Sequence, residues 1–448
     1  MRPSFLTAIA LGLAGLGATL GTARPPALLP ARSDSTPPSS SWLALLPDGT
    51  AKRRFILDCT GCHQFDERMA RPGGKPRTEA DWAQSVARML GFAGPNSGFP
   101  VISAGQHPDS TARWLATALS DRVPQSGGDS ATPLAGTVTE FLLPGPQDLP
   151  HDVAVDATGR VIVTGMFTHT MYTLDSLTGE FASVPIPVDK SNPRAVEVDG
   201  QGRWWVVLGA PGQIARYDGV AWKTFETGLY AHSIALDSAG SAWVNGHFSR
   251  DPEVLVGVTS EGVVRIVDLP GHPTMRDIPG GPIPYELRAA PDGRIWMSEL
   301  QGNRMVSFDP RTGEKAAYDL PAAWSGPRRF DIDRSGILWI PAYSAGSLVR
   351  FDPAKREFKE YPLPVKDALP YVARVDHGTG RVWIGTGAAD QLFAFDSRSG
   401  RFRGVRLPSR GALVRHLAVD PRTHDVWLAY GESPGKLPAR IARFRPTR

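Results

Sequence analysis

The sequence of 448 residues predicts a mainly β fold, in which a seven-bladed β-propeller of four-stranded antiparallel blades follows a small all-α domain. From residue 136 onward, apolar and polar residues alternate, and a large apolar residue returns at a nearly constant period. This marker series is Ile162, Trp205, Trp243, Trp296, Trp339, Trp383 and Trp427, with steps of 43, 38, 53, 43, 44 and 44 residues. Such a period suits four short strands per repeat, as in a propeller blade.

A second marker, a strand that ends in proline, counts the repeats independently. Copies include "VTEFLLP", "KAAYDLP" and "FRGVRLP". The first copy, within residues 137–144, precedes the first full repeat, and the last repeat lacks its own copy. We therefore expect the first strand to complete the last blade and close the ring. An open solenoid is the competing architecture. The extra strand before the first repeat and the missing strand in the last repeat favour a closed ring.

The longest step contains "LPGHPTMRDIPGGPIP", residues 269–284. Its glycines and prolines predict a long loop rather than an extra strand. A lid, a docking surface for the helical domain and a passive surface excursion are the three interpretations.

The N-terminus resembles an export signal, because Arg2 precedes an apolar run over residues 5–20 and small residues follow at 21–23. We expect cleavage after residue 23 and a periplasmic or secreted bacterial protein. An uncleaved membrane anchor is the alternative, but the apolar run of about 16 residues is short for a bilayer. No other stretch is expected to span a membrane.

The remaining boundaries follow from composition. Residues 24–41 are rich in Pro and Ser, which predicts a disordered spacer. We expect a helical domain over residues 42–122, a linker over 123–135 and the propeller over 136–446. The net charge of +4 is small and Lys and Arg are scattered, which argues against nucleic-acid binding.

Both cysteines of the chain lie in the helical domain, in Cys59-Thr60-Gly61-Cys62-His63. This is the C-x-x-C-H motif of covalent c-type haem, in which two thiols bond the porphyrin and the histidine binds the iron. The predicted export agrees with attachment outside the cytoplasm. A redox dithiol and a structural zinc site are the alternatives, but the βαβ context and the second ligand pair that they need are missing.

The segment "RTEADWAQSVARMLGFAG" predicts a helix with Thr78 as N-cap, which places Trp82, Val86, Met89 and Leu90 on one face. A second helix follows in "DSTARWLATALS". The pattern resembles small c-type cytochromes whose Trp-x-x-x-Val-x-x-Met helix carries an iron ligand. The resemblance implies Met89 as the sixth ligand. His107 is the second choice, and a purely structural Met89 is the alternative.

The propeller repeats resemble the streptogramin lyase (virginiamycin B lyase) family over residues 136–446. The unit "GPIPYELRAAPDGRIWMSELQGNRMVSFDPRTGEKAAYDLP" carries this resemblance. It implies a seven-bladed propeller, catalytic histidines in the last two repeats and a Glu that helps to hold Mg²⁺.

One residue per repeat leads into the innermost strand and is expected to line the channel. This column contains His151, Arg194, His232, Tyr285, Arg328, Tyr371 and Arg415. Such a ring suits a polar or anionic ligand, or the propionates of a docked haem. The alternative is that these side chains fill the channel and bond to the backbone.

The column departs from the lyase pattern, because its last two members are Tyr371 and Arg415 rather than histidines. His416 is one position further on and is expected to face outward. These replacements argue against the lyase reaction and its Mg²⁺. An altered catalytic site is expected to draw on four residues, namely His151, His232, Glu286 and Glu299.

The first functional hypothesis is an exported mono-haem protein in electron transfer, with a redox partner protein or a small-molecule electron donor. The propeller then binds a ligand or partner, and the protein acts as a relay or as a haem-linked oxidoreductase. A Mg²⁺-dependent lyase or hydrolase with an accessory haem domain is the second hypothesis. A non-catalytic binding scaffold is the third.

Overall fold

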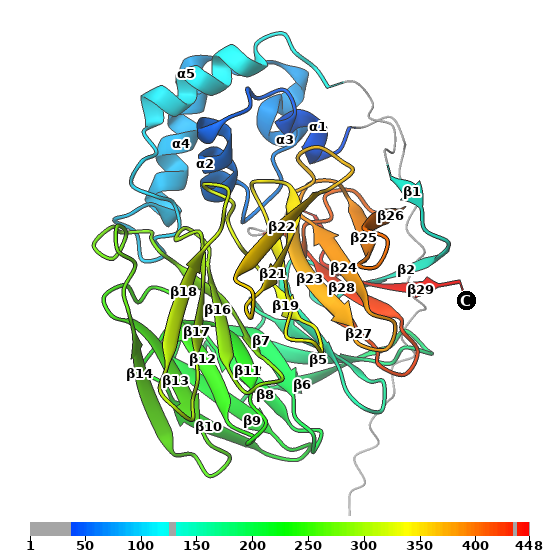
Figure 1. Ribbon diagram of the computed structural model, residues 1–448. Coiled ribbons are helices and arrows are strands. Elements are labelled where there is room, and N and C mark those ends of the chain that lie inside the picture. The colour runs from blue at the N-terminus through cyan, green and yellow to red at the C-terminus, as the bar shows by residue number, and fades with distance from the viewer. Residues whose placement is uncertain (1–36, 125–130, 433–436, 448) are drawn as a thin grey trace, which may run out of the picture.

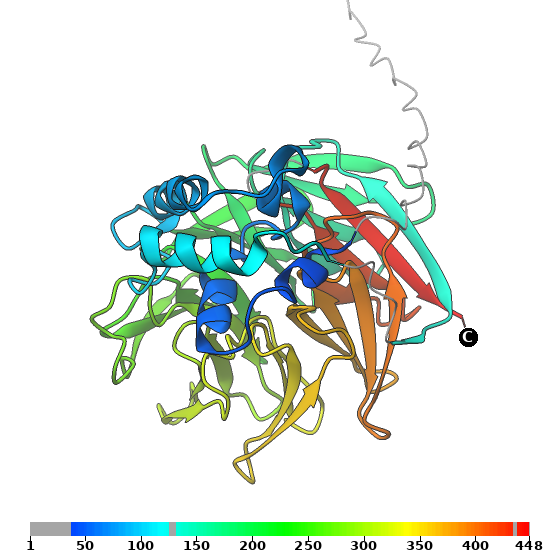
Figure 2. The same cartoon turned by 90° about the horizontal axis from the view of Figure 1, so that it is seen from above.

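A computed structural model describes residues 37–124, 131–432 and 437–447 of the chain. The predicted signal, 1–23, lies outside these residues. Within them, a closed propeller forms one layer and a cap of short helices covers one end of its axis (Figures 1 and 2). No helix of the described part is long and apolar enough to cross a membrane.

Seven sheets radiate around the axis, which confirms the predicted seven blades of four antiparallel strands. The first blade contains β3 (Pro150–Val155), β4 (Val161–Gly165), β5 (Thr170–Leu174) and β6 (Phe181–Pro185). The second contains β7 (Pro193–Val198), β8 (Trp204–Leu208), β9 (Gln213–Tyr217) and β10 (Trp222–Glu226). The third contains β11 (Ala231–Leu236), β12 (Ala242–Gly246), β13 (Glu253–Val258) and β14 (Val264–Leu269). The next two contain β15 (Pro284–Ala289), β16 (Ile295–Glu299), β17 (Arg304–Phe308) and β18 (Lys315–Asp319), then β19 (Asp331–Ile332), β20 (Leu338–Ala342), β21 (Ser347–Asp352) and β22 (Glu357–Pro362).

The last two blades show how the ring closes. They contain β23 (Pro370–Asp376), β24 (Arg381–Thr386), β25 (Gln391–Asp396) and β26 (Arg401–Arg406), then β27 (Val414–Val419), β28 (Val426–Tyr430) and β29 (Arg440–Pro446). The seventh blade is completed by β2 (Gly136–Leu142), which pairs antiparallel with β29 from Gly136 opposite Pro446 to Leu142 opposite Arg440. The predicted closure by the first strand is therefore confirmed.

The tryptophan markers have a structural role. The indole Nε1 of Trp205 donates to Asp199 Oδ2 at 3.0 Å, and that of Trp243 donates to Asp237 Oδ2 at 2.8 Å. Each Asp also accepts backbone N–H groups of the turn between the first two strands of its blade. In these blades, and in the fifth, where Trp339 Nε1 donates to Asp333 Oδ2 at 3.0 Å, the marker ties this turn to the second strand.

Five helices form the cap, namely α1 (Ser39–Leu43), α2 (Thr50–Cys59), α3 (Glu67–Ala70), α4 (Glu79–Ala93) and α5 (Pro108–Leu119), with a 3₁₀ turn at Pro72–Gly74. The Thr78 and Asp81 side chains form the expected capping box of α4. Phe55 packs edge-on against Phe65 and Trp114, which joins α2 to α5. Helices occur where the pattern predicts them, whereas an identification as a cytochrome fold stays a prediction.

Two predicted boundaries are wrong. The spacer was expected to reach residue 41, but α1 begins at Ser39, and the Ser40 N–H donates to Ala388 O of the propeller at 2.8 Å. The linker was expected to reach residue 135, but β1 (Thr132–Pro133) pairs in parallel with β26, and the Leu134 N–H donates to Gly404 O at 2.8 Å. The first contact is to a loop and the second to the outer strand of the sixth blade, and composition reports neither.

The cap and the propeller share one apolar core. Leu43, Ile56 and Leu57 of the helices belong to the same buried cluster as Leu369 and Leu413 of the propeller. The long loop over residues 269–284 also contacts the cap, because a Cβ at Gly280 would lie 2.8 Å from Ile102 O. Of its three interpretations, the contact favours the docking surface.

We predict that Phe141→Ala, in the closing strand, lowers the free energy of unfolding by about 3–5 kcal/mol. Phe141 is buried and stacks on Trp427 with ring centroids 6.0 Å apart, so its loss leaves a cavity at the seam of the ring. Chemical denaturation measures the change. Val220→Ala, at a site 91% exposed, is the control and should shift stability by less than about 0.5 kcal/mol. Equal effects of the two variants would contradict closure through β2.

Candidate functional site

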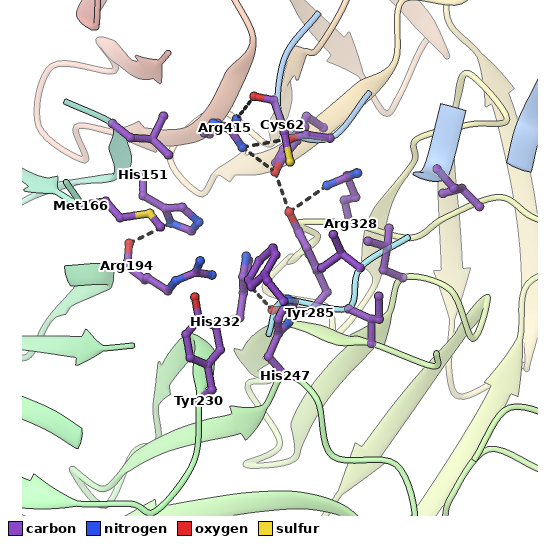
Figure 3. A pocket seen from close by; sticks show the side chains of 18 of the residues that line it. Cys62, His151, Met166, Arg194, Tyr230, His232, His247, Tyr285, Arg328 and Arg415 are labelled. Atoms are coloured by element: carbon purple, nitrogen blue, oxygen red, sulfur yellow. Dashed lines mark hydrogen bonds between the residues drawn. The ribbon is translucent and has the colours of Figure 1, made fainter. Parts of the chain in front are cut away.

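The seven residues of the predicted column meet around one cavity of about 260 Å³ at the capped end of the channel (Figure 3). They are His151, Arg194, His232, Tyr285, Arg328, Tyr371 and Arg415, and each is at most 5% exposed. Each lies at or just before the start of the innermost strand of its own blade. The repeat itself therefore builds the ring.

A second column also reaches the cavity, and the sequence reasoning missed it. The residue four positions after each marker immediately follows the second strand of its blade. Met166, His247 and Leu300 of this column line the cavity. Tyr343, from the same column, lies under the Arg328 guanidinium at 4.0 Å from its ring centroid. The constant spacing from the marker was the signal that could have identified them.

A break in strand register turns two consecutive residues of each innermost strand inward. The pairing of β27 with β28 shifts between Val414 and His416, and that of β3 with β4 shifts between Pro150 and Val153. The expectation that His416 faces outward is therefore wrong. It is buried, and its Nε2 lies 2.6 Å from Arg374 Nη2. A bulge adds one residue to a strand, and simple alternation does not apply there.

Beneath the ring, the inward-turned residues form a buried ionic layer. Arg329 lies 2.8 Å from Asp152 and 3.4 Å from Glu286, which also contacts Arg374 at 2.8 Å and Arg288 at 3.0 Å. Burial alone would raise the pKa of Asp152, but the neighbouring Arg329 and His416 hold it below its usual range. The layer neutralises its own charges and forms the floor of the site.

Three imidazoles of the cavity are neutral. His232 Nδ1 lies 2.9 Å from Tyr285 O, and His247 Nδ1 lies 2.8 Å from Pro284 O, so each Nδ1–H donates to a backbone carbonyl. His151 Nδ1 likewise lies 2.9 Å from Arg194 O. Burial lowers the pKa of His151 to about 4 and that of His247 to about 3, and it lowers the pKa of His232 well below its usual value. The Nε2 atoms of His232 and His247 therefore stay acceptors at neutral pH. His151 Nδ1 also faces the Arg329 Nη2 donor at 3.0 Å and Asp152 Oδ1 at 2.9 Å.

The three arginines of the ring have only neutral partners. Arg328 Nη1 donates to Tyr285 Oη at 2.8 Å, and Arg194 Nε donates to Asn192 Oδ1 at 3.3 Å. Among the residues that the structure describes, none of the three ring arginines forms an ion pair with a carboxylate. The Tyr285 and Tyr371 hydroxyls share a hydrogen bond of 2.6 Å. Burial would raise the pKa of Tyr371, but the surrounding guanidinium groups lower it on balance.

The Cys-Thr-Gly-Cys-His segment forms the roof of the cavity. Arg415 donates to Gly61 O at 3.1 Å and to Cys62 O at 2.6 Å. Tyr343 Oη donates to Thr60 O at 3.0 Å, and Gln64 Nε2 donates to Gly387 O at 2.9 Å. The roof is therefore held to the blades by hydrogen bonds on both sides of Cys62, which itself lines the cavity.

The segment offers the donors that covalent haem would use, two thiols and an imidazole, and of these three residues only Cys62 lines the cavity. Cys59 ends α2 and Cys62 lies three residues beyond it, and burial raises the pKa of the Cys59 thiol. His63 Nδ1 lies 3.2 Å from Gln64 O, which leaves Nε2 as the available ligand atom. Met89 is half-buried on α4 and does not line the cavity, and His107 is exposed at the start of α5.

The four residues of the expected catalytic site do not form one cluster. His151 and His232 lie together, with ring centroids 5.1 Å apart, at the cavity. Glu286 lies in the ionic layer beneath them, and Glu299 lies apart in the fourth blade, paired with Arg304 at 2.6 Å. Within the described ranges, no three His, Cys, Asp or Glu side chains converge as a metal site.

Several solved structures share the propeller fold. A streptogramin B lyase structure is 18% identical, with a TM-score of 0.61, over 69% of this chain and 98% of that one. A catalytically inactive virginiamycin B lyase from Staphylococcus aureus with quinupristin is 17% identical, with a TM-score of 0.61, over 70% of this chain and all of that one. The WD40 repeats of RRP9 reach a TM-score of 0.57 at 10% identity, over 71% and 99% of the two chains.

These similarities establish a fold that resembles that of streptogramin B lyase. They establish no activity, because the identities are low and propellers carry many functions. No protein-family model and no curated protein matches the chain.

We predict that Arg329→Leu lowers the free energy of unfolding by about 3–5 kcal/mol, because it leaves Asp152 and Glu286 buried without their partner. Arg334→Leu, an exposed change in the same blade, is the control. Chemical denaturation of both variants measures the difference. A neutral outcome for Arg329→Leu would mean that the ionic layer is open to water.

The pair Glu253 and Glu299 should make stability fall as pH rises. Burial raises the pKa of Glu299 to about 7, and burial together with Glu299 raises that of Glu253 to about 9. The native state then binds more protons than the unfolded state between about pH 4.5 and pH 9, so raising the pH through this window destabilises it.

Glu253→Gln should remove much of this slope. The melting temperature of the wild type should fall by at least about 2 °C more than that of the variant between about pH 5 and pH 9. Differential scanning calorimetry at a series of pH values measures it. Parallel curves for the two proteins would contradict the shared burial of the two carboxyl groups.

Proposed function

We propose that the chain is an exported mono-haem electron-transfer protein in which the propeller binds a ligand or partner at the cavity beneath the Cys-Thr-Gly-Cys-His roof. One observation carries the proposal: Cys62 lines the same cavity as the whole ring of column residues. The motif and the ring are far apart in sequence, and the fold brings them together. Their meeting at one cavity is what a joint function requires.

Residues of the roof supply the attachment. Cys59 and Cys62 would hold the porphyrin through thioether bonds, and His63 would bind the iron through Nε2. When bound, the haem supplies one-electron transfer at a potential that its surroundings tune. Met89 as the sixth ligand and a redox protein or small molecule as the electron donor remain parts of this proposal.

The ring residues are suited to holding a ligand rather than to lyase chemistry. Tyr371 and Arg415 occupy the positions at which the lyase resemblance implies histidines, and both are buried in the cavity wall. His416 lies next to Arg415 but belongs to the ionic layer, 3.4 Å from Asp152. No specific observation favours the Mg²⁺-dependent lyase or hydrolase, and the plain scaffold gives no reason for a thiol in the cavity wall.

We predict that the protein, exported by a bacterium with c-type haem attachment machinery, shows a reduced-minus-oxidised haem spectrum that persists after acidified acetone extraction. Cys59→Ala/Cys62→Ala should lose the pigment, because both thioether links are absent. Lys75→Ala, at an exposed position of the same helical domain, is the control and should keep it.

Circular dichroism of each variant separates loss of haem from loss of the fold. A folded, colourless wild type would refute the haem proposal. If the haem is present, stopped-flow absorbance can follow its reduction by candidate donors and identify the electron source. A haem that no donor reduces would refute the electron-transfer role.

A further inference from the structure

The cavity carries three buried positive charges, and among the described residues no carboxylate forms an ion pair with any of them. Arg194, Arg328 and Arg415 are each at most 5% exposed. Phenols, carbonyls and an amide are the partners that surround them, and Arg328 Nε has no hydrogen-bond partner in the described structure. Isolated buried charges are costly, so a site with three of them is stabilised by an anion from outside.

The acidic groups nearby are already engaged. Asp58 also lines the cavity, but its carboxylate accepts from Ser103 N–H, Ser103 Oγ, Gln106 Nε2 and Gln301 Nε2 at 2.7–3.0 Å. Asp152 and Glu286 are bound to Arg329 in the layer below. In the described structure, none of these three carboxylates forms an ion pair with a ring arginine.

The rest of the wall indicates what the anion is attached to. Leucine, isoleucine, valine, methionine and aromatic side chains share the lining with the arginines and the neutral imidazoles. On one side the wall consists of the half-buried Met166, Tyr230 and Phe99, the last packed against Tyr230 at 6.0 Å and Phe248 at 5.3 Å. A planar guanidinium fork matches a carboxylate, and the apolar wall matches a compact hydrophobic body.

We propose that this cavity is a carboxylate site that takes a small apolar carboxylate, with Arg328 and Arg194 as its principal donors. The inference rests on the proposed function in that it uses the same cavity. The carboxylate has two sources: a free ligand that enters beside Phe99, or the propionates of the proposed haem. The chemistry of recognition is the same for both.

Binding is tested with benzoate against its uncharged isostere benzamide, by isothermal titration calorimetry on the full chain. Both the haem-loaded protein and the haem-free Cys59→Ala/Cys62→Ala variant are titrated. Benzoate should bind at least about tenfold more tightly than benzamide, because a hydrogen-bonded ion pair replaces a neutral contact. Binding by both proteins identifies a free ligand site, and binding by the haem-free variant alone identifies the propionates as the natural carboxylates.

Variants identify the donors. Arg328→Met and Arg194→Met should each weaken benzoate by about tenfold to a hundredfold and leave benzamide unchanged. Arg398→Met, at an exposed position on the sixth blade, is the control and should bind as the wild type. Two residues are changed separately so that one misfolded variant does not remove the test.

Absence of benzoate binding in both proteins, or equal affinity for benzoate and benzamide, would overturn the inference. These outcomes are independent of the haem proposal. A colourless wild type that binds benzoate would support the carboxylate site and refute the haem proposal. A haem-containing protein that binds benzoate neither with haem nor as the haem-free variant would support the haem proposal and refute the carboxylate site.

Discussion

The structure depends on the seating of the Cys-Thr-Gly-Cys-His segment on the mouth of the propeller. Arg415 binds two consecutive carbonyls of this segment, and a Cβ at Gly61 would lie 2.9 Å from Arg328 Nη2. The segment therefore covers the channel mouth, and glycine at position 61 leaves room for the Arg328 guanidinium. Because of this contact, the helices are not an independent appendage, and the channel end becomes a covered cavity.

Charge is divided between two levels of the channel. In the lower layer, Arg288, Arg329 and Arg374 face the carboxylates of Asp152, Glu197, Glu286 and Asp331. In the upper ring, the arginines face phenols, carbonyls and imidazoles. The lower layer pairs its own charges and stabilises the fold. The ring arginines have no carboxylate partner, and this is why we propose that they bind a ligand. The division follows from the strand bulges, which turn two successive columns inward.

The repeat markers predicted the blades, the closing strand and the seven ring residues, because each repeat places equivalent positions at equivalent points around the axis. Alternation failed at His416, since a bulge changes which side chains face the channel. Contacts between distant segments also escaped prediction. Nothing local indicates that Gln64 reaches Gly387 and Asp390 of the sixth blade, or that Phe99 lies against Tyr230. Met89 keeps its implied role only as a proposal, because spacing along a helix does not determine what the helix faces.

The central claim is that the two-cysteine segment and the propeller ring line one cavity. A crystal structure of the full exported chain tests it most directly. The account predicts that the carbonyls of Gly61 and Cys62 lie within hydrogen-bond distance of the Arg415 guanidinium, with Cys62 at the edge of the ring cavity. A structure in which the helical cap is displaced and the channel mouth is open to solvent would contradict it.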